Sequence, residues 1–534
     1  MAEAESYLIL LAIVSATGIV FRKSRVPFPF LLVIVGMCLS LLPMFPSISL
    51  KPEIILNIFL PMLVYRTSAV TSWKDVKFNF RPIILLSIGH VIFITFLVAF
   101  VVHTLIPELS WPLAFILGAV ISPPDDVAIV AIAKNIRMPE RIVTILKGEG
   151  MLNDAAALII FRFSLLALIT HQFSVMDAVS SFVLIIIGET AYGLLLGFLI
   201  GELRLKIKDI DLQMSISILT PFIAYFIPLK LGGSGILATV VTGLVISYKY
   251  LDRVEPEMRI VGQAFWSILE FFIQSILFLL VGLEFREILA GITIIPSKSL
   301  IFYALAVVAT VIIGRFIWVY PATFIPRFLF PSIRKKDPYP PWQYPIVVSW
   351  AGMRGAISLA AAFVVPALPM VGGIDPRYLL LFLVFCTIMA TLLLQGLSLP
   401  WLLKVLKVQS LSLREQYCEH LGELSAKLLI IKAVIRWLKE FKALMKDNPE
   451  LLEEIKLSLQ DYRMRKKRLQ DRIAKHSEGF EHDEEGERRE SVFLNNRILE
   501  VERNALDDLW HKDKINHVLR TKMQNELDRL ETPD

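Results

Sequence analysis

Long apolar stretches separated by short polar segments fill the first three quarters of the chain, and this pattern predicts a bundle of membrane-spanning helices. A helix needs roughly 20 apolar residues to cross the ~30 Å hydrocarbon core of a bilayer, and most of the stretches approach or exceed that length. We therefore predict an all-α polytopic membrane protein with about 13 transmembrane helices. The stretches cover residues 6–21, 26–45, 52–66, 81–105, 112–134, 140–169, 176–203, 211–229, 233–249, 261–285, 299–325, 343–369 and 376–402.

The pattern changes near residue 409, where charged residues become frequent and apolar residues recur at alternating steps of three and four. This spacing places the apolar side chains on one face of a helix, where they could bind a regulatory ligand or a partner protein. We expect two domains: a transmembrane domain over residues 1–408, and a helical cytoplasmic domain over residues 409–534 with a regulatory or assembly role. The apolar face consists of Leu421, Leu424, Leu428, Ile431, Ile435 and Leu438.

The composition agrees with this division. Hydrophobic residues make up 55% of the 534-residue chain and charged residues only 19%, with a mean hydropathy of +0.62, which excludes an ordinary soluble protein. Residues 1–408 carry 31 Lys or Arg against 23 Asp or Glu, whereas the tail carries 24 against 26. The basic excess thus lies in the loops of the membrane domain, and nucleic acid is not an expected partner.

The distribution of Lys and Arg among the loops predicts the orientation in the membrane, because cytoplasmic loops carry the excess of these residues. One alternate set of connections contains 20 basic residues and the other set only five. The basic set includes the connection after the first stretch, so we predict a cell-membrane protein with its N-terminus outside and its tail in the cytoplasm. The basic connections lie near residues 22–25, 66–81, 134–141, 204–208, 249–259 and 327–336.

The sequence contains no GxxxxGK[ST] phosphate loop, no HExxH motif and no Cys/His cluster, so we expect no ATP-driven step, no metal enzyme and no cofactor. Any work would then be driven by ion gradients. The candidate functional residues are the ionisable ones inside the apolar stretches, since each costs roughly 2.5–3.5 kcal/mol to place at the centre of a membrane helix. Three clusters of such residues occur.

The first cluster, Ser122-Pro123-Pro124-Asp125-Asp126, lies near the middle of the fifth stretch. Two adjacent prolines donate no backbone hydrogen bonds and push the preceding residue out of helical geometry, so we expect the helix to break here. Carbonyl oxygens freed beside Asp125 would suit a desolvated cation such as Na⁺, and broken helices of this kind mark the sites of secondary transporters. The alternative is a plain proline kink beside a solvated acid.

The second cluster is Glu149, Asn153 and Asp154 in the sixth stretch. Glu149 and Asn153 are four residues apart and share a helix face, whereas Asp154 is turned by about 100° and can face a neighbouring span. If Asp154 and Asp125 share one cavity, burial and mutual repulsion favour a proton or a cation on the pair, and the two ions compete for one site. The alternative is that these acids are neutralised in fixed structural pairs.

The third cluster, Gly352-Met353-Arg354-Gly355, interrupts the twelfth stretch with a buried cation that needs a carboxylate partner. We predict a structural ion pair between Glu149 and Arg354 that braces the site and leaves the two aspartates free to titrate. If stretches 1–6 and 8–13 are inverted repeats, the interrupted fifth stretch corresponds to the interrupted twelfth, as expected for a transporter with its site at the repeat interface.

The segments SPPDDVAIVAI, GEGMLNDAAAL and SWAGMRGAISLAAA, in this order, resemble the motifs of the bacterial monovalent cation:proton antiporters, in the Na⁺/H⁺ exchanger branch. The resemblance covers most of the chain. It implies thirteen spans, a homodimer in the lipid bilayer, and electroneutral exchange of Na⁺, or of Li⁺ or K⁺, for H⁺ by an elevator-like movement. Such an antiporter would serve pH and cation homeostasis.

Within this resemblance, Asp154 is similar to the ion-carrying aspartate, Asn153 to its neighbour, and Asp125 to the partner acid on the broken helix. Na⁺ would bind at Asp125 and Asp154, with Asn153 and the backbone carbonyl of Pro124 nearby. Glu149 with Arg354 is similar to the bracing pair. Four further residues could line the cavity, and one of them stands where some relatives place an acid. These four are Ser122, Asp126, Arg66 (the residue at the acidic position) and Glu270.

Two alternatives belong to other classes. An intramembrane aspartyl protease would also use two buried aspartates to activate water, but the GxGD motif of such proteases is absent from the sequence. A cation channel would conduct without coupling one ion to another. A substrate-cleavage assay and a coupling measurement, respectively, distinguish these alternatives from an antiporter.

Overall fold

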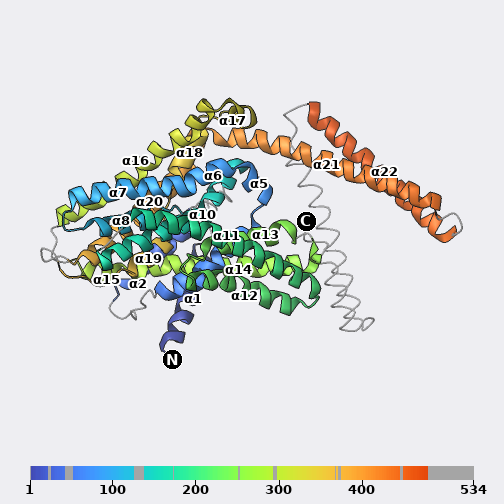
Figure 1. Cartoon of the computed structure of the whole chain (residues 1–534). Coiled ribbons are helices and arrows are strands. Elements are labelled where there is room, and N and C mark those ends of the chain that lie inside the picture. The colour runs from blue at the N-terminus through green and yellow to red at the C-terminus, as the bar shows by residue number, and fades with distance from the viewer. Residues whose placement is uncertain are drawn as a thin grey trace. The chain divides into compact units, whose positions relative to one another are not determined.

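The computed structural model describes residues 2–21, 26–42, 52–125, 138–171, 174–250, 253–292, 297–366, 368–370, 375–444 and 449–478. All regular secondary structure in these ranges is helical (Figure 1). The helices of the first half are α1 (Ala2–Val20), α2 (Phe28–Ser40), α3 (Pro52–Ile54), η1 (Ile55–Phe59), α4 (Leu60–Val70), α5 (Trp73–Phe78), α6 (Phe80–Ile84), η2 (Leu85–His90), α7 (Val91–Leu105), α8 (Trp111–Ile121), α10 (Glu140–Thr170), α11 (Val175–Lys206), α12 (Ile210–Lys230) and α13 (Ile236–Lys249). The remaining helices are α14 (Pro256–Leu283), α15 (Phe285–Ala290), α16 (Ser297–Leu329), α17 (Pro331–Lys336), α18 (Gln343–Trp350), α19 (Ala356–Phe363), α20 (Pro376–Val405), α21 (Val408–Leu444) and α22 (Pro449–Glu478).

The helices coincide with the apolar stretches of the sequence. In the described part of the chain, eight helices are long and apolar enough to cross a membrane, and four shorter apolar helices accompany them. Every predicted stretch contains at least one helix, and the stretch 343–369 is divided between two, α18 and α19. The predicted class, an all-α multi-pass membrane protein, is confirmed. Helices suit this environment because they satisfy their backbone hydrogen bonds internally, where lipid offers no partner.

The short helix α8 lies at the centre of the membrane unit, in contact with α7, α10, α19 and α20. Eight of its eleven residues are buried. Small residues allow close contacts between helices: a β-carbon at Gly118 of α8 would collide with the backbone of Thr95 in α7. By contrast, only 22% of the apolar span of α11 and 28% of that of α16 are buried inside the protein, so these helices leave most of their apolar residues on the surface of the membrane unit.

Two helices are interrupted inside the bundle. Helix α8 ends at Ile121, directly before Ser122-Pro123-Pro124, because the prolines cannot continue the backbone hydrogen bonds. Residues 351–355 separate α18 from α19 without helical structure. The break in the fifth stretch and the break in the twelfth were both predicted from the sequence, and both occur. The relation between the two halves as inverted repeats stays a prediction.

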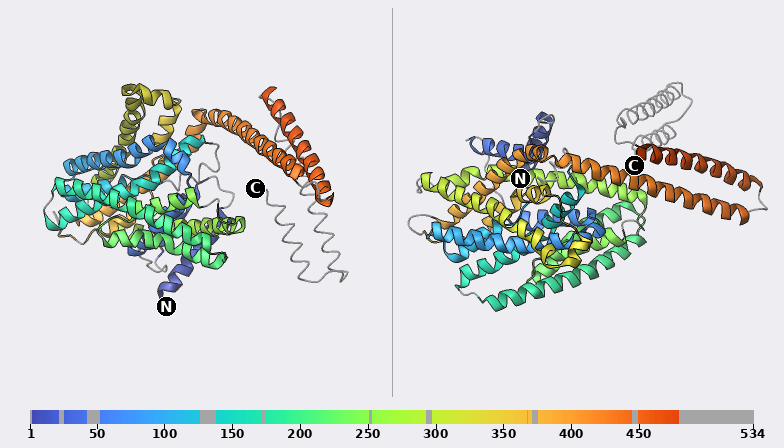
Figure 2. Two further views of the ribbon diagram at one scale, coloured as in Figure 1. Left: turned by 45° about the vertical axis from the view of Figure 1, so that its right-hand side comes forward. Right: turned by 90° about the horizontal axis from the view of Figure 1, so that it is seen from above.

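The chain divides into two compact units, residues 1–414 and residues 415–534. In the second unit, the end of α21 and the start of α22 lie side by side in both views of Figure 2 and bury Leu438 against Ile455 and Leu459. Apolar residues at helical spacing on both helices account for this contact. Leu438 belongs to the apolar face predicted from the sequence.

Candidate ion-binding site

The two helix breaks meet each other. The backbone N–H of Asp125, after the end of α8, donates a hydrogen bond of 2.7 Å to the carbonyl of Met353, between α18 and α19. Each interruption thereby satisfies a backbone group that the other helix leaves without an intrahelical partner. Two segments that are more than 200 residues apart in the sequence therefore form one irregular region in the interior of the membrane unit.

Helix α10 is attached to this region by Asn153. Its side-chain Nδ2 donates a hydrogen bond of 2.8 Å to the carbonyl of Pro124, and the residue is fully buried. The prediction placed the Pro124 carbonyl near the ion, and in the structure this oxygen accepts from Asn153. The other amide atom, Asn153 Oδ1, is buried and has no hydrogen-bond partner among the described residues. A buried acceptor of this kind suits a cation or a proton donor, because leaving it unpaired costs about 1–3 kcal/mol.

Asp125 and Asp154 line the same cavity, which has a volume of about 560 Å³. Asp125 comes from the broken end of α8, and Asp154 comes from α10, one residue after Asn153. Gly355 also lines this cavity and lies directly against Asp125, so that a β-carbon there would collide with the Asp125 carboxylate. The cavity therefore holds two carboxylates next to backbone and amide oxygens, which are the ligands that hard cations prefer.

A second cavity of about 280 Å³ also contains Asp154 in its wall. The two cavities share Pro123, Ile357 and Ser358 in addition to Asp154. Asp125 lines only the larger of the two. Asp154 is thus the acid of this pair that borders both spaces.

The predicted ion pair between Glu149 and Arg354 is wrong. Glu149 pairs instead with Arg315 of α16 through two hydrogen bonds, Nη1 to Oε1 at 2.7 Å and Nη2 to Oε2 at 2.8 Å, and both side chains are 1% exposed. A bidentate Arg–carboxylate contact is among the strongest side-chain interactions, and burial of both partners makes this one structural. Arg315 is the single Lys, Arg, Asp or Glu in the eleventh stretch, residues 299–325, and a charge at that depth needs a partner of opposite charge.

Arg354 has a different role, because it lies at a break and not opposite a helix face. Its Nε donates to the carbonyl of Ile121 at 2.5 Å and its Nη1 to the carbonyl of Gly352 at 2.5 Å, while its backbone N–H donates to Thr391 Oγ1 at 3.1 Å. These carbonyls lie at the end of α8 and in the break after α18, where helical partners are missing. Arg354 therefore caps both breaks, and Nη2 has no partner in the described ranges.

The residues predicted to line the cavity are placed differently. The Ser122 hydroxyl turns back to the carbonyl of Ala119 at 3.0 Å, and the residue is fully buried. Asp126 lies outside the described residues. Arg66 and Glu270 form an ion pair of 3.4 Å between α4 and α14 and do not line either cavity. They reach the larger cavity only indirectly.

Gln274 of α14 makes that connection. It lines the cavity of Asp125 and Asp154, and its Nε2 donates to Glu270 Oε1 at 3.2 Å. Its position four residues after Glu270, on the same helix face, was the available signal. The polar chain from Arg66 through Glu270 thus ends at the wall of the site.

In this protein, two broken helices meet in the interior of a membrane bundle, and two carboxylates lie beside the breaks. These features define a secondary transporter. The family model described as "Sodium/hydrogen exchanger, transmembrane" matches residues 9–405. The chain belongs to the sodium/hydrogen exchanger family and is an antiporter, not an enzyme, so the aspartyl protease alternative is set aside.

Individual relatives agree with this placement. The chain is similar to the "Sodium, potassium, lithium and rubidium/H(+) antiporter" of Bacillus pumilus, with 30% identity over 98% of this chain and 77% of that protein. It is 30% identical to the "Na(+)/H(+) antiporter ApNhaP" of Aphanothece halophytica, over 79% of this chain and 78% of that protein. Among solved structures, the sodium proton antiporter MjNhaP1 of Methanocaldococcus jannaschii has a similar fold, with a TM-score of 0.61 and 16% identity over 76% of this chain and 99% of that chain.

Proposed function

We propose that this protein exchanges Na⁺, and also Li⁺ or K⁺, for H⁺ at a single site formed by Asp125 and Asp154, with Asn153 as a third ligand. The observation that carries the proposal is that both carboxylates line one cavity at the meeting point of two broken helices. A pair of half-buried carboxylates binds one monovalent cation or one proton more readily than it stays doubly charged. The relative from Bacillus pumilus is named for Na⁺, K⁺, Li⁺ and Rb⁺, which supports a site that accepts several alkali cations.

Charge counting supports one-for-one exchange. Glu149 and Arg315 neutralise each other, so neither contributes net charge to the site. Arg354 follows Met353 at the break and adds one positive charge to the two negative charges of Asp125 and Asp154. One monovalent cation or one proton then restores neutrality, and the loaded site has the same charge with either ion. Exchange between two such states is electroneutral.

We propose alternating access by an elevator-type movement of the part of the membrane unit that carries α8, α10, α18 and α19. The position of Asp154 supports this, because the residue borders two adjacent cavities. If first one cavity and then the other opens to water, Asp154 becomes accessible from each side in turn. The hydrogen bond from Asn153 to Pro124 joins α10 to the break after α8, so these elements would move together.

The orientation and the partners belong to the same proposal. The 20 basic residues in one set of loops, against five in the other, support an external N-terminus and a cytoplasmic tail. The family resemblance supports a homodimer in the cell membrane and a role in pH and cation homeostasis. The tail, with the helical hairpin of α21 and α22, is proposed to bind a regulatory ligand or protein.

Coupling distinguishes an antiporter from a channel. Full-length protein is reconstituted into vesicles with equal K⁺ on both sides and valinomycin, which clamps the membrane potential, and an outward Na⁺ gradient is imposed. An antiporter acidifies the lumen under these conditions, because each Na⁺ that leaves admits one proton. A channel leaves the lumenal pH unchanged, and that result would overturn the proposal.

A further inference from the structure

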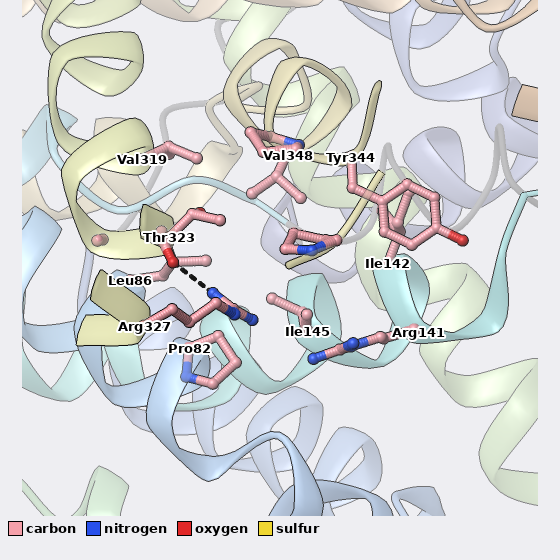
Figure 3. A pocket seen from close by; sticks show the side chains of 13 residues that line it. Pro82, Leu86, Arg141, Ile142, Ile145, Val319, Thr323, Arg327, Tyr344 and Val348 are labelled. Atoms are coloured by element: carbon pink, nitrogen blue, oxygen red, sulfur yellow. Dashed lines mark hydrogen bonds between the residues drawn. The ribbon is translucent and has the colours of Figure 1, made fainter. Parts of the chain in front are cut away.

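A third pocket lies at the end of the membrane unit where α10 begins, away from the two cavities of the candidate ion-binding site. It is open to the surface, and its volume of about 540 Å³ includes the space at its mouth. Five helices contribute to its walls: α6, η2, α10, α16 and α18. Figure 3 shows Arg141 and Arg327 along one side of the pocket and Tyr344 and Val348 along the other.

Three arginines converge on one carboxylate beside this pocket. Asp337 accepts hydrogen bonds from Arg81 at 2.5 Å, Arg141 at 2.6 Å and Arg327 at 2.7 Å. These arginines form no ion pair with another carboxylate in the described part of the chain. Three guanidinium groups and one carboxylate give this cluster a net charge of about +2. This excess positive charge favours the binding of an anion.

Part of the donor capacity of this group is unused. Nη1 of Arg81 is buried behind the pocket wall and has no acceptor among the described residues, whereas Arg81 itself does not line the pocket. Arg141 lines the pocket directly and its guanidinium lies 5.8 Å from the ring centre of Phe78. Guanidinium groups bind phosphate oxygens with paired, charge-assisted hydrogen bonds, so a phosphate is the anion that fits these donors.

The rest of the pocket is apolar. Leu86, Ile142, Ile145, Val319 and Val348 form its inner wall, which a free phosphate would not use. Burying methylene groups against such a wall is favourable by about 0.8 kcal/mol each. A ligand that contacts both the arginines and the apolar wall would consist of a phosphate joined to a hydrocarbon chain.

The surroundings place this pocket at the membrane surface. The neighbouring helix α17 exposes Arg334, Lys335 and Lys336, and the large side chains of Tyr339 and Trp342 are also exposed. Aromatic and basic residues gather in this way at the headgroup level of a bilayer, where basic residues attract anionic lipids. These exposed residues are the kind that meet the headgroups of a bilayer.

We propose that this pocket binds one anionic phospholipid, with its phosphate on Arg141 beside Arg327 and the upper part of an acyl chain against Ile142 and Ile145. Helix α10 lines both this pocket and the ion cavity. The lipid therefore contacts the helix that carries Asp154.

The test uses full-length, delipidated protein in detergent, titrated with phosphatidylglycerol or with neutral phosphatidylcholine, and counts bound lipids by native mass spectrometry. We expect one phosphatidylglycerol with an affinity about tenfold above that of phosphatidylcholine, a difference of about 1.4 kcal/mol. Arg141→Gln removes a phosphate contact, and Ile145→Trp fills the acyl space without changing charge, so each should lower that affinity about tenfold. Lys335→Gln removes the same charge from the exposed face of α17 and should leave binding unchanged.

Three results would overturn the proposal. Equal affinity for the two lipids removes the role of the arginines, and an equal effect of Lys335→Gln reduces the binding to general surface attraction. Displacement of the lipid by inorganic phosphate would indicate a phosphate site without a hydrocarbon part. If Arg141→Gln lowers the melting temperature of the protein, Ile145→Trp carries the test alone. Lipid counting does not depend on transport, so a failure here is distinct from a failure of the antiport proposal.

Discussion

Glu149 and Arg315 form a bidentate ion pair, 2.7 and 2.8 Å long, between two helices in the interior of the membrane unit. Helix α10 also carries Asn153 and Asp154, so the pair fixes the helix that supplies half of the ion-binding site. Because Arg315 neutralises Glu149, that acid does not add to the charge of the site.

Replacing Glu149 with Gln is expected to destabilise the protein by about 3–5 kcal/mol, because it leaves the Arg315 guanidinium buried and uncompensated. The melting temperature of detergent-solubilised protein measures this loss. The double variant Glu149→Leu with Arg315→Leu should recover most of the stability. In a double-mutant cycle, a coupling of Glu149 to Arg354 as large as that to Arg315 would contradict the assignment of the pair.

Asn153→Ala should weaken ion binding without removing it. The substitution deletes the donor to Pro124 and the unpaired oxygen Oδ1, so we expect the Na⁺ concentration for half-maximal transport to rise about tenfold, equivalent to about 1.4 kcal/mol. Dye-detected proton movement in vesicles over a range of Na⁺ concentrations gives this value. Ser164→Ala, on the same helix with its hydroxyl bonded to Ile160, is the control that should leave it unchanged.

Gly355→Ala should impair transport through a steric effect alone. Its β-carbon would collide with the Asp125 carboxylate, which must then move out of the site geometry. We expect transport to fall about tenfold or more, since a small displacement of a binding group is costly. Gly188→Ala is the matched control, because a β-carbon on Gly188 of α11 meets nothing within 4 Å. Equal activity of the two variants would show that Asp125 is not confined at this position.

Asp337 makes stability depend on acid pH. Burial raises the pKa of this carboxylate, but hydrogen bonds from and charges of Arg141 and Arg327 outweigh burial and hold the pKa below its usual value. The stabilisation is therefore complete above the ordinary aspartate pKa of about 3.9 and is lost as pH falls through the lower folded-state pKa. Asp337→Asn should lower the melting temperature at neutral pH. The difference from the unchanged protein should shrink below about pH 4, and a difference that persists there would contradict the assignment.

The sequence predicts the helices and their breaks better than it predicts which side chains pair. Two consecutive prolines at 123 and 124 remove two backbone donors in succession, and the glycines at 352 and 355 disfavour a helix, so both breaks follow from local chemistry, although α12 and α16 each contain single prolines. The partner of Glu149 does not, because it depends on how α16 is rotated about its axis relative to α10. One buried acid and two buried arginines give two pairings that the sequence cannot separate.

The same limit applies to the lining of the site. Arg66 and Glu270 are 204 residues apart, and their mutual contact removes both from the cavity wall while leaving Gln274 there. The direction of the Ser122 hydroxyl, back to the carbonyl of Ala119, depends on how α8 ends. Long-range packing decides these positions, and a single sequence does not record it.

We propose that one alkali cation and one proton compete at Asp154, and the variant Asp154→Asn tests this competition. Asparagine keeps the size of the side chain and removes its charge and its proton. In vesicles with a pH-sensitive dye, we predict that Na⁺-dependent proton movement is abolished in Asp154→Asn. It should be retained in Asp211→Asn, which makes the same change at an exposed position of α12. Full Na⁺-dependent proton movement in a folded Asp154→Asn protein would contradict the account.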